Sequence, residues 1–318
     1  MKRVLVTGAA GMIGRRVASA LLERGDAVAG LDDLSSGMSL PQGLHAAIVA
    51  DVSDRATLAA TLREFRADAL IHLAAIHHIP TCETQRMRCL QVNVVGTESV
   101  LHAASDAVLP QVVIASSGAV YAWGDGALDE HASATEARDN YALSKLCNEA
   151  QLRLWCTAES GRRGRAARLF NTIAHDDPNA HLIPDVLAQL AADPAAAPLL
   201  RLGNLQPRRD YLHADDAAAG LIALLDDVRQ DPAFDVFNLC SGVEYSVAEL
   251  VEQIGAVLGR SPRLQVDPQR QRRIDRLHQL GDPGKAARVL GWRARWSLRE
   301  ALQRVLAATG APAAGHHV

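Results

Sequence analysis

Short apolar runs alternate with amphipathic stretches along this chain. The first run, Val4-Leu5-Val6, is followed by apolar residues at helical spacing from Val17 to Leu22. Similar runs recur at residues 27–31, 48–50, 69–75, 112–115 and 166–170, and residues 93–104 have a helical pattern. Strands that alternate with helices predict an α/β fold with a doubly wound parallel sheet, whose ligands bind beyond the carboxyl ends of the strands.

Three glycines separate the first predicted strand from its helix. Gly8, Gly11 and Gly14 would permit a tight turn, a close approach of the backbone to a pyrophosphate, and close packing of helix on strand. A glycine-rich turn without chemical meaning is the alternative. The order strand, loop, helix favours a dinucleotide site, which would include Met12 and Ile13.

Acidic residues follow the second and third predicted strands. Asp32 and Asp33 lie where a carboxylate accepts hydrogen bonds from ribose hydroxyls and repels a 2′-phosphate. Residues 31–40 contain no arginine that would bind that phosphate, so NAD is predicted rather than NADP. Asp51 and Val52 end the third strand, where the acid could reach the adenine amino group.

Tyr141 and Lys145 are four residues apart and so lie on one face of a predicted helix. A free tyrosine has a pKa of roughly 10, and a neighbouring ammonium favours the phenolate and lowers that value. The pair alone is a weak signal, because solvated helices carry it by chance. Its position downstream of a dinucleotide loop favours a role in proton transfer.

Length and composition fit one large α/β unit with a smaller attached region. The chain has 318 residues, 48% hydrophobic, and a net charge of −3. The chain has no long block of like charge, and residues 270–273 form only a short basic cluster, which argues against nucleic acid as a main partner. No apolar run approaches the roughly 18 residues needed to span a bilayer, so no membrane association is expected.

The chain ends and the cysteines suggest a cytoplasmic protein. Residues 1–3 run directly into the first strand, so no signal peptide is expected. The five cysteines are odd in number and lack metal-ligand spacing, which predicts reduced thiols and no metal site. Residues 311–318 are expected to form a flexible tail.

Taken in chain order, the motifs resemble those of the extended short-chain dehydrogenases/reductases of the NAD-dependent nucleotide-sugar epimerase/dehydratase family. The resemblance covers almost the whole chain and rests on residues 7–14, 32–37, 72–75, 93–97, 116–121, 141–145, 168–171, 209–216, 237–242 and 290–292. It implies a Rossmann domain over residues 1–170, completed by about residues 208–240. Residues 171–207 and 241–310 would then form a smaller C-terminal α/β domain that binds a nucleotide sugar.

The same resemblance implies roles for individual residues. Ser117 would hydrogen-bond the reacting sugar oxygen, Tyr141 would be the acid/base, and Lys145 would lower its pKa and hold the nicotinamide ribose. Further cofactor contacts are expected from Leu73, Ala74, Ala75, His77, Asn93 and Ser116. Contacts with the sugar diphosphate are expected from Asn171, Arg209, Arg272 and Arg273. A solvated basic loop is an open alternative for the arginine cluster.

The implied reaction is 4-epimerisation of a nucleotide sugar, by transient oxidation at C4 and re-reduction by the bound NADH. Gly118-Ala119 stand where relatives that catalyse 4,6-dehydration have Asp-Glu, and Ala119 replaces the cysteine of 3,5-epimerases. Both reactions are therefore disfavoured. His77 and His78 could supply a second acid/base, although a polar lining role is favoured.

Two other functions stay open. One is a 4-keto-6-deoxysugar reductase or a nucleotide-sugar dehydrogenase, and residues 202–210 resemble members acting on GDP-sugars more than those acting on UDP-sugars. The other is a non-catalytic NAD-binding regulatory protein, against which the intact Ser117, Tyr141 and Lys145 argue.

Two predicted helices carry more apolar residues than one packed face needs. They contain Leu143, Leu146, Ala150, Leu152 and Leu154, and Val94, Val95, Val100 and Leu101. The resemblance implies that these helices pair with their copies in a homodimer. The alternative is that the protein's own sheet and termini cover both.

Overall fold

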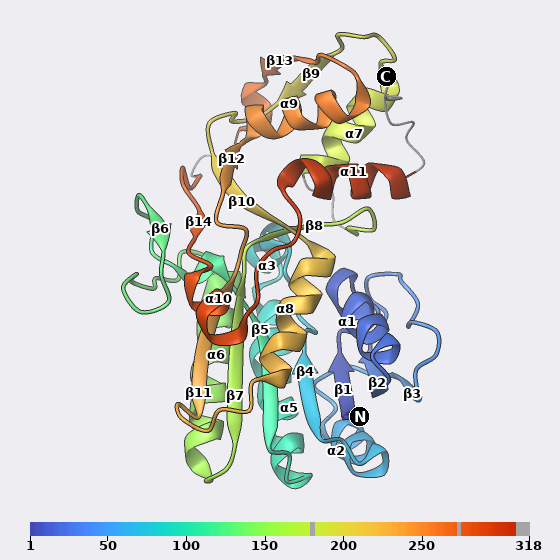
Figure 1. The fold of residues 1–318 in the computed structure, drawn as a ribbon, viewed down its shortest axis with the longest axis vertical. Coiled ribbons are helices and arrows are strands. Elements are labelled where there is room, and N and C mark those ends of the chain that lie inside the picture. Colours follow the sequence, from blue (N-terminus) through green and yellow to red (C-terminus); the bar gives the residue numbers. More distant parts are fainter. Residues whose placement is uncertain (179–181, 272–274, 310–318) are drawn as a thin grey trace.

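Seven parallel strands form the central sheet of the computed structural model, which describes residues 1–178, 182–271 and 275–309. Their order is β11-β7-β5-β4-β1-β2-β3 (Figure 1). The strands are β1 (Arg3–Thr7), β2 (Ala27–Asp32), β3 (Ala46–Val49), β4 (Ala69–His72), β5 (Gln111–Ser117), β7 (Arg163–Leu169) and β11 (Phe234–Leu239). The chain order reverses between β1 and β4, where ligands bind in folds of this kind. The predicted doubly wound α/β fold is confirmed.

Helices cover both faces of this sheet (Figure 1). One face packs against α1 (Met12–Glu23), α8 (Ala214–Asp226) and α10 (Gly284–Leu290), and the other against α2 (Arg55–Phe65), α5 (Gly96–Asp106) and α6 (Asn140–Ala158). Along β1, Val4 and Val6 join the first layer and Leu5 joins the second. This two-sided burial explains why the strand is a continuous apolar run.

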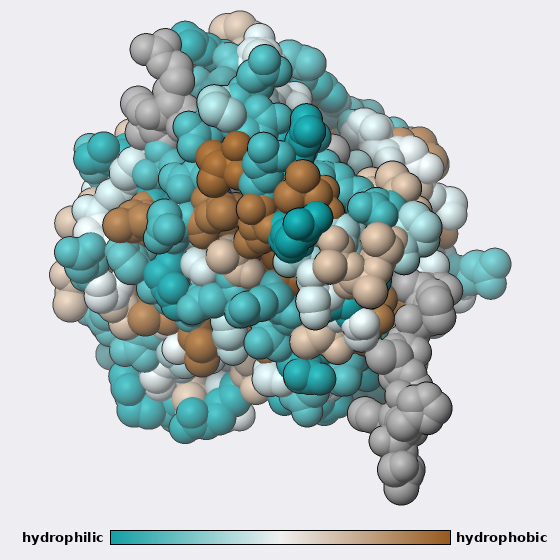
Figure 2. Space-filling model, turned by 90° about the horizontal axis from the view of Figure 1, so that it is seen from above, coloured by the Kyte–Doolittle hydropathy of each residue, from teal (hydrophilic) through white to brown (hydrophobic). Residues whose placement is uncertain are grey.

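A smaller body lies across the carboxyl ends of the large sheet, at the top of Figure 1. Its sheets have the orders β12-β10-β8 and β13-β9, and a further pair joins β14 to β6. The strands are β6 (Ala127–Leu128), β8 (Asn171–Ile173), β9 (Leu199–Leu202), β10 (Arg208–His213), β12 (Glu244–Ser246), β13 (Arg263–Val266) and β14 (Leu280–Gly281). The helices are α7 (Leu182–Ala192), α9 (Val247–Leu258) and α11 (Leu298–Ala308), which share a separate apolar core. Figure 2 shows the end of the molecule formed by this body, with apolar residues gathered inside a polar surround.

The range 208–240 contributes to both bodies. Helix α8 and strand β11 return to the large sheet, whereas β10 pairs with β8 and β12 in the smaller one. The domain limits given by the sequence therefore stay a prediction.

The chain between β4 and α5 is more helical than its sequence pattern indicates. Helices α3 (Ile79–Thr84) and α4 (Arg86–Leu90) lead into a π-helical turn over Gln91–Val95, and this turn continues into α5. Short 3-10 turns occupy Gly118–Val120 and Pro268–Arg270. Across the described ranges, no helix has the length and apolar character needed to cross a membrane.

Candidate active site

A cavity of about 1580 Å³ runs from the loop after β1, past the first turn of α6, to α7 and β10. Most of the predicted site residues line it. Besides those treated individually below, the lining includes Met12, Ile13, Val52, Leu73, Ala74, Ala75 and Asn171. The carboxyl ends of the large sheet and the smaller body thus enclose one continuous space.

Backbone hydrogen bonds and close backbone packing hold the glycine loop in a tight turn. Gly8 has a φ of +69°, and its amide donates to the Leu31 carbonyl at 2.9 Å. A Cβ on Gly14 would lie 1.9 Å from the Gly8 oxygen, and one on Gly8 would lie 2.6 Å from the Ala74 nitrogen. No side chain fits at either position, which leaves bare backbone at the amino end of α1. This arrangement fits the pyrophosphate of a dinucleotide.

Asp32 ties the glycine loop to the end of β2. One carboxylate oxygen accepts from the Ala10 amide at 3.0 Å, and the other from the Leu34 amide at 2.8 Å. An ionised carboxylate has about four acceptor positions, so acceptor capacity remains for ribose hydroxyls. Both Asp32 and Asp33 line the cavity, as the sequence predicts.

Asp51 is held from two sides at the same end of the cavity. Its Oδ1 accepts from the Ser53 amide and hydroxyl, both at 2.8 Å, and its Oδ2 accepts from Arg88 at 3.0 Å. Burial opposes ionisation, but these hydrogen bonds outweigh it and lower the pKa of Asp51. Arg88 comes from α4 and was not among the predicted site residues.

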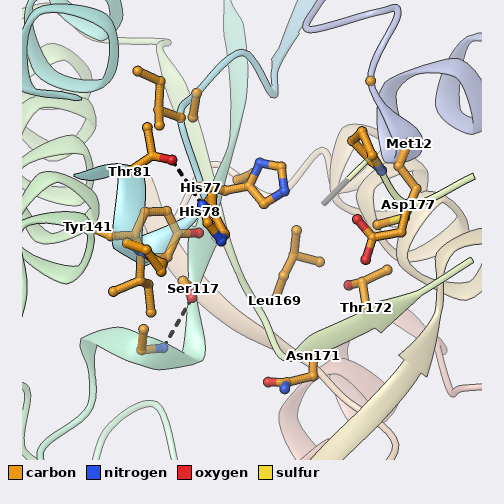
Figure 3. A pocket seen from close by; sticks show the side chains of 18 of the residues that line it. Met12, His77, His78, Thr81, Ser117, Tyr141, Leu169, Asn171, Thr172 and Asp177 are labelled. Atoms are coloured by element: carbon orange, nitrogen blue, oxygen red, sulfur yellow. Dashed lines mark hydrogen bonds between the residues drawn. The ribbon is translucent and has the colours of Figure 1, made fainter. Parts of the chain in front are cut away.

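Tyr141, Ser117 and Lys145 meet in the middle of the cavity. Asp139 caps α6 by accepting from the Ala142 amide at 2.7 Å, which places Tyr141 in the first turn. Ser117 lies at the end of β5, and Figure 3 shows the side chains of Tyr141 and Ser117 facing the same space. The Lys145 ammonium lies 5.7 Å from the centre of the Tyr141 ring and donates to the Ala115 carbonyl at 2.8 Å.

The ionisation of this group differs from the expectation drawn from the Tyr-Lys spacing. Burial raises the pKa of Tyr141 to about 12, although the Ser117 side chain opposes the change. Burial also lowers the pKa of Lys145 to about 8. Desolvation of the phenol therefore decides the direction of the shift, and Tyr141 is a neutral phenol at neutral pH.

His77 and His78 lie beside this group. Figure 3 shows both imidazole rings inside the cavity, on the side of Tyr141. The Nδ1 atom of His78 lies 2.9 Å from the hydroxyl of Thr81, at the start of α3. These positions agree with the predicted role of His77 and His78 as polar residues that line the cavity.

Asn93 lies behind the cavity wall and is fully buried. Its amide nitrogen donates to the Ile76 carbonyl at 2.9 Å, and its amide oxygen accepts from the Ile76 amide at 2.8 Å. A further hydrogen bond at 2.9 Å joins it to Ser144 on α6. Asn93 therefore holds the segment that carries His77, whereas the sequence assigned it a direct cofactor contact.

Ser116 reaches the cavity, but its hydroxyl points elsewhere. It donates to Glu149 at 2.5 Å, and Glu149 forms a bidentate ion pair with Arg168 at 2.8 and 2.9 Å. Both charged side chains are buried. This pair locks the ends of β5 and β7 to α6, beneath Ser117 and Tyr141.

Arg209 lines the opposite end of the cavity and is fixed by its neighbours. One guanidinium nitrogen donates to Asp275 at 2.8 Å and another to the Arg276 carbonyl at 2.7 Å. Arg272 and Arg273, the other arginines predicted to bind the diphosphate, lie outside the described residues. Within the described ranges, no group of three or more His, Cys, Asp or Glu side chains could hold a metal ion.

Sequence reasoning missed Arg276, which also lines the cavity. Its side chain is buried and donates to the carbonyls of Gly118 at 3.3 Å and Ala122 at 3.2 Å, in the turn after Ser117. Burial lowers its pKa to about 10. The arginine-rich sequence around it gives no signal that singles it out.

Comparison with known proteins agrees with this geometry. The model of the NAD dependent epimerase/dehydratase family matches residues 4–240. A UDP-glucose 4-epimerase of Bacillus subtilis is 30% identical over 326 residues, covering 93% of this chain and 94% of that protein. A GDP-6-deoxy-D-mannose reductase of Pseudomonas aeruginosa is 29% identical over 244 residues, covering 75% of this chain and 79% of that protein.

A solved structure extends the match to the whole fold. The UDP-glucose 4-epimerase of Brucella ovis in complex with NAD aligns with a TM-score of 0.86 and 26% identity, over 99% of this chain and 100% of that one. The glycine loop and Asp32 fit the pyrophosphate and ribose of the same cofactor. The chain therefore belongs to the NAD-dependent epimerase/dehydratase family, and its cofactor is NAD.

Proposed function

We propose that this protein is an NAD-dependent nucleotide-sugar 4-epimerase. The observation that carries the proposal is that Tyr141 and Ser117 face the same part of a cavity that runs from the glycine loop to Arg209. At about 1580 Å³, this cavity exceeds the roughly 300–1,000 Å³ of an ordinary small-molecule site. It has room for a dinucleotide and a nucleotide sugar together.

The glycine loop and Asp32 would hold NAD, which would supply a reversible hydride acceptor, so the net redox change of the proposed reaction would be zero. Ser117 hydrogen-bonds the sugar oxygen. Tyr141 first loses its hydroxyl proton to solvent, and the resulting phenolate oxygen takes the proton of the sugar hydroxyl and later gives it back. The Lys145 ammonium, 5.7 Å from the ring centre, stabilises negative charge on the phenolate as it forms. The Glu149–Arg168 pair keeps the strand and helix that carry these groups in register.

The far end of the cavity suits a sugar diphosphate. Arg209 presents a guanidinium whose orientation is fixed by Asp275, and Asn171 begins β8, where it pairs with Tyr211 on the same strand as Arg209. Guanidinium groups bind phosphate oxygens through paired hydrogen bonds. A sugar diphosphate anchored here would extend its sugar toward Tyr141.

A 4-keto-sugar reductase is the second candidate, because the Pseudomonas relative is named as a GDP-6-deoxy-D-mannose reductase. The same Tyr141 and Ser117 would then deliver a proton to a ketone, and NADH would be consumed. The two reactions differ in whether reduced nicotinamide is used up.

A panel of UDP- and GDP-sugars, with product analysis by NMR, tests the proposal. The expected result is a mixture of C4 epimers, approached from either epimer, without net change in the absorbance of reduced nicotinamide. Tyr141→Phe is the matched control and should form the epimer roughly 10²–10⁴-fold more slowly. Stoichiometric oxidation of NADH by a keto-sugar, with no epimerisation of any sugar in the panel, would replace the epimerase with the reductase.

We further propose a homodimer that forms through α5 and α6, which pack side by side. On α6, Leu143 is 42% exposed and Leu154 is 69% exposed, while Leu152 is fully buried beneath them. Val95 adds exposed apolar surface at the start of α5. Apolar side chains exposed on two neighbouring helices are costly in a monomer. Light scattering should give twice the 34.0 kDa chain mass, and Leu154→Glu should reduce it toward the mass of one chain. An active wild-type monomer at assay concentration would contradict the proposal.

A further inference from the structure

The end of the cavity near β2 and β3 carries three carboxylates and a guanidinium from a distant helix. Asp32 and Asp33 follow β2, Asp51 follows β3, and Arg88 belongs to α4. The Arg88 guanidinium lies 3.0 Å from Asp51 and 3.8 Å from Asp33. It therefore connects two strand ends across the part of the cavity whose acidic residues suit the adenosine of NAD.

We propose that Arg88 acts as a clasp over the adenosine of bound NAD, which it retains by bridging α4 to Asp51 and Asp33. Arg88 would close this end of the cavity once the cofactor is inside. Its loss would speed release of the cofactor.

Other contacts position both partners of the ion pair between Arg88 and Asp51. Ser53 occupies Asp51 Oδ1 with two hydrogen bonds, which leaves Oδ2 turned toward Arg88. On the other side, Cys89, the next residue of α4, is fully buried and accepts a hydrogen bond from Asn93 at 3.6 Å. Both ends of the bridge are thus held by contacts independent of the ion pair.

The side chains of this ion-pair bridge are partly exposed to solvent, which suits a contact that opens and closes. The side chains of Arg88, Asp33 and Asp51 are 45%, 34% and 32% exposed, and ion pairs of that kind add little to the stability of a fold. Opening the clasp in the NAD-free protein is therefore cheap. With an adenine ring beneath it, the guanidinium gains a π face on which planar cations stack. The clasp is consequently stronger when the cofactor is bound.

Cofactor retention has a direct consequence for the proposed 4-epimerase, on which this step rests. One nicotinamide must accept a hydride and return it to the same sugar. Release of the cofactor between the two steps would leave the keto-sugar without a hydride donor. The clasp itself requires only that NAD binds, and its test measures cofactor release without any sugar present. The proposed function and the clasp can therefore fail separately.

Release of NADH from Arg88→Met tests the clasp. The enzyme is loaded with NADH and mixed with a large excess of NAD, and the loss of bound-NADH fluorescence gives the release rate. We expect release to be about tenfold faster than in the wild type, the size of one ion pair and one cation–π contact at a partly exposed site. Higher salt should speed release from the wild type but barely affect Arg88→Met.

Arg86→Met is the matched control on the same helix. Arg86 is more exposed than Arg88, and its ion-pair partner is Glu83, at 4.0 Å. Its substitution should leave NADH release within about twofold of the wild type. Should Arg88→Met fail to fold, Arg88→Lys keeps the charge but not the planar fork, and about threefold faster release would support the clasp. Unchanged release and unchanged salt dependence in the Arg88 variant would overturn it.

Discussion

Lys145 is a buried cation, so Lys145→Met should stabilise the NAD-free protein while it abolishes turnover. The residue is 4% exposed, and its ammonium donates to the Ala115 carbonyl at 2.8 Å. Burial lowers its pKa from 10.5 to about 8, which means that the fold disfavours the charge. Methionine keeps an unbranched stem of similar length and buries no charge.

The structure sets the size of the expected effect. The fall in pKa from 10.5 to about 8 corresponds to about 3 kcal/mol, at about 1.4 kcal/mol per pH unit. The substitution also removes the donor to the Ala115 carbonyl, which costs about 1 kcal/mol. We therefore expect Lys145→Met to raise the free energy of unfolding by about 2 kcal/mol at neutral pH.

The effect should depend on pH with a defined sign. Below about pH 8 both folded and unfolded chains hold the proton on Lys145, and the folded state bears the full cost of the charge. Between about pH 8 and 10.5 the unfolded chain binds more protons, so the stability of the wild type rises with pH. Above that range the cost is gone. The advantage of Lys145→Met should therefore shrink as the pH rises through this window.

Urea unfolding of NAD-stripped proteins, at about pH 7 and about pH 10, measures both effects. Lys285→Met is the matched control, because Lys285 is also buried but is paired with Asp235 at 2.6 Å. Its loss should destabilise the protein by about 1–3 kcal/mol, since it leaves a buried carboxylate with fewer partners. A Lys145→Met protein less stable than the wild type at about pH 7, or an advantage that persists at about pH 10, would refute the reasoning.

Three further predictions concern the same cavity. Tyr141→Phe should lower turnover by roughly 10²–10⁴-fold, with the affinity for NAD unchanged in calorimetry. Ser117→Ala should lower turnover by a smaller factor. If Tyr141→Phe kept the turnover of the wild type, another residue would have to be the base. Asp32→Ala should narrow the preference for NAD over NADP, and equal wild-type affinities for the two cofactors would contradict the role of this acid. Gly14→Ala should abolish NAD binding while the protein stays folded by circular dichroism, because its Cβ would lie 1.9 Å from the Gly8 oxygen; full binding would show that the loop can move aside.

The parts of this protein that depend on local spacing were predictable from the sequence. The glycine loop requires only three positions in one turn, and Asp32 needs only its place at the end of β2. Tyr141 and Lys145 share a helix face because they are four residues apart. Strands of a parallel sheet that are buried on both faces can be recognised in the sequence, because their residues are apolar without interruption.

The contacts that join distant segments depend on the tertiary structure. Arg88 meets Asp51 because the tertiary structure brings its side chain on α4 to the residues that follow β3, and nothing in the local sequence marks it among its arginine neighbours. Asn93 is buried and hydrogen-bonds the Ile76 carbonyl. The Arg276 guanidinium donates to the carbonyl of Gly118, which lies much earlier in the chain.

Burial, too, is a property of the folded molecule. From the sequence, the ammonium of Lys145 was expected to lower the pKa of Tyr141, yet in the structure burial raises that pKa to about 12. The sequence by itself determined which chemical groups this protein possesses and their order along one helix, strand or turn, because those arrangements follow from backbone periodicity. Only the tertiary structure decided which of them meet, which are removed from water and therefore which are charged, because desolvation depends on every segment packed around a group.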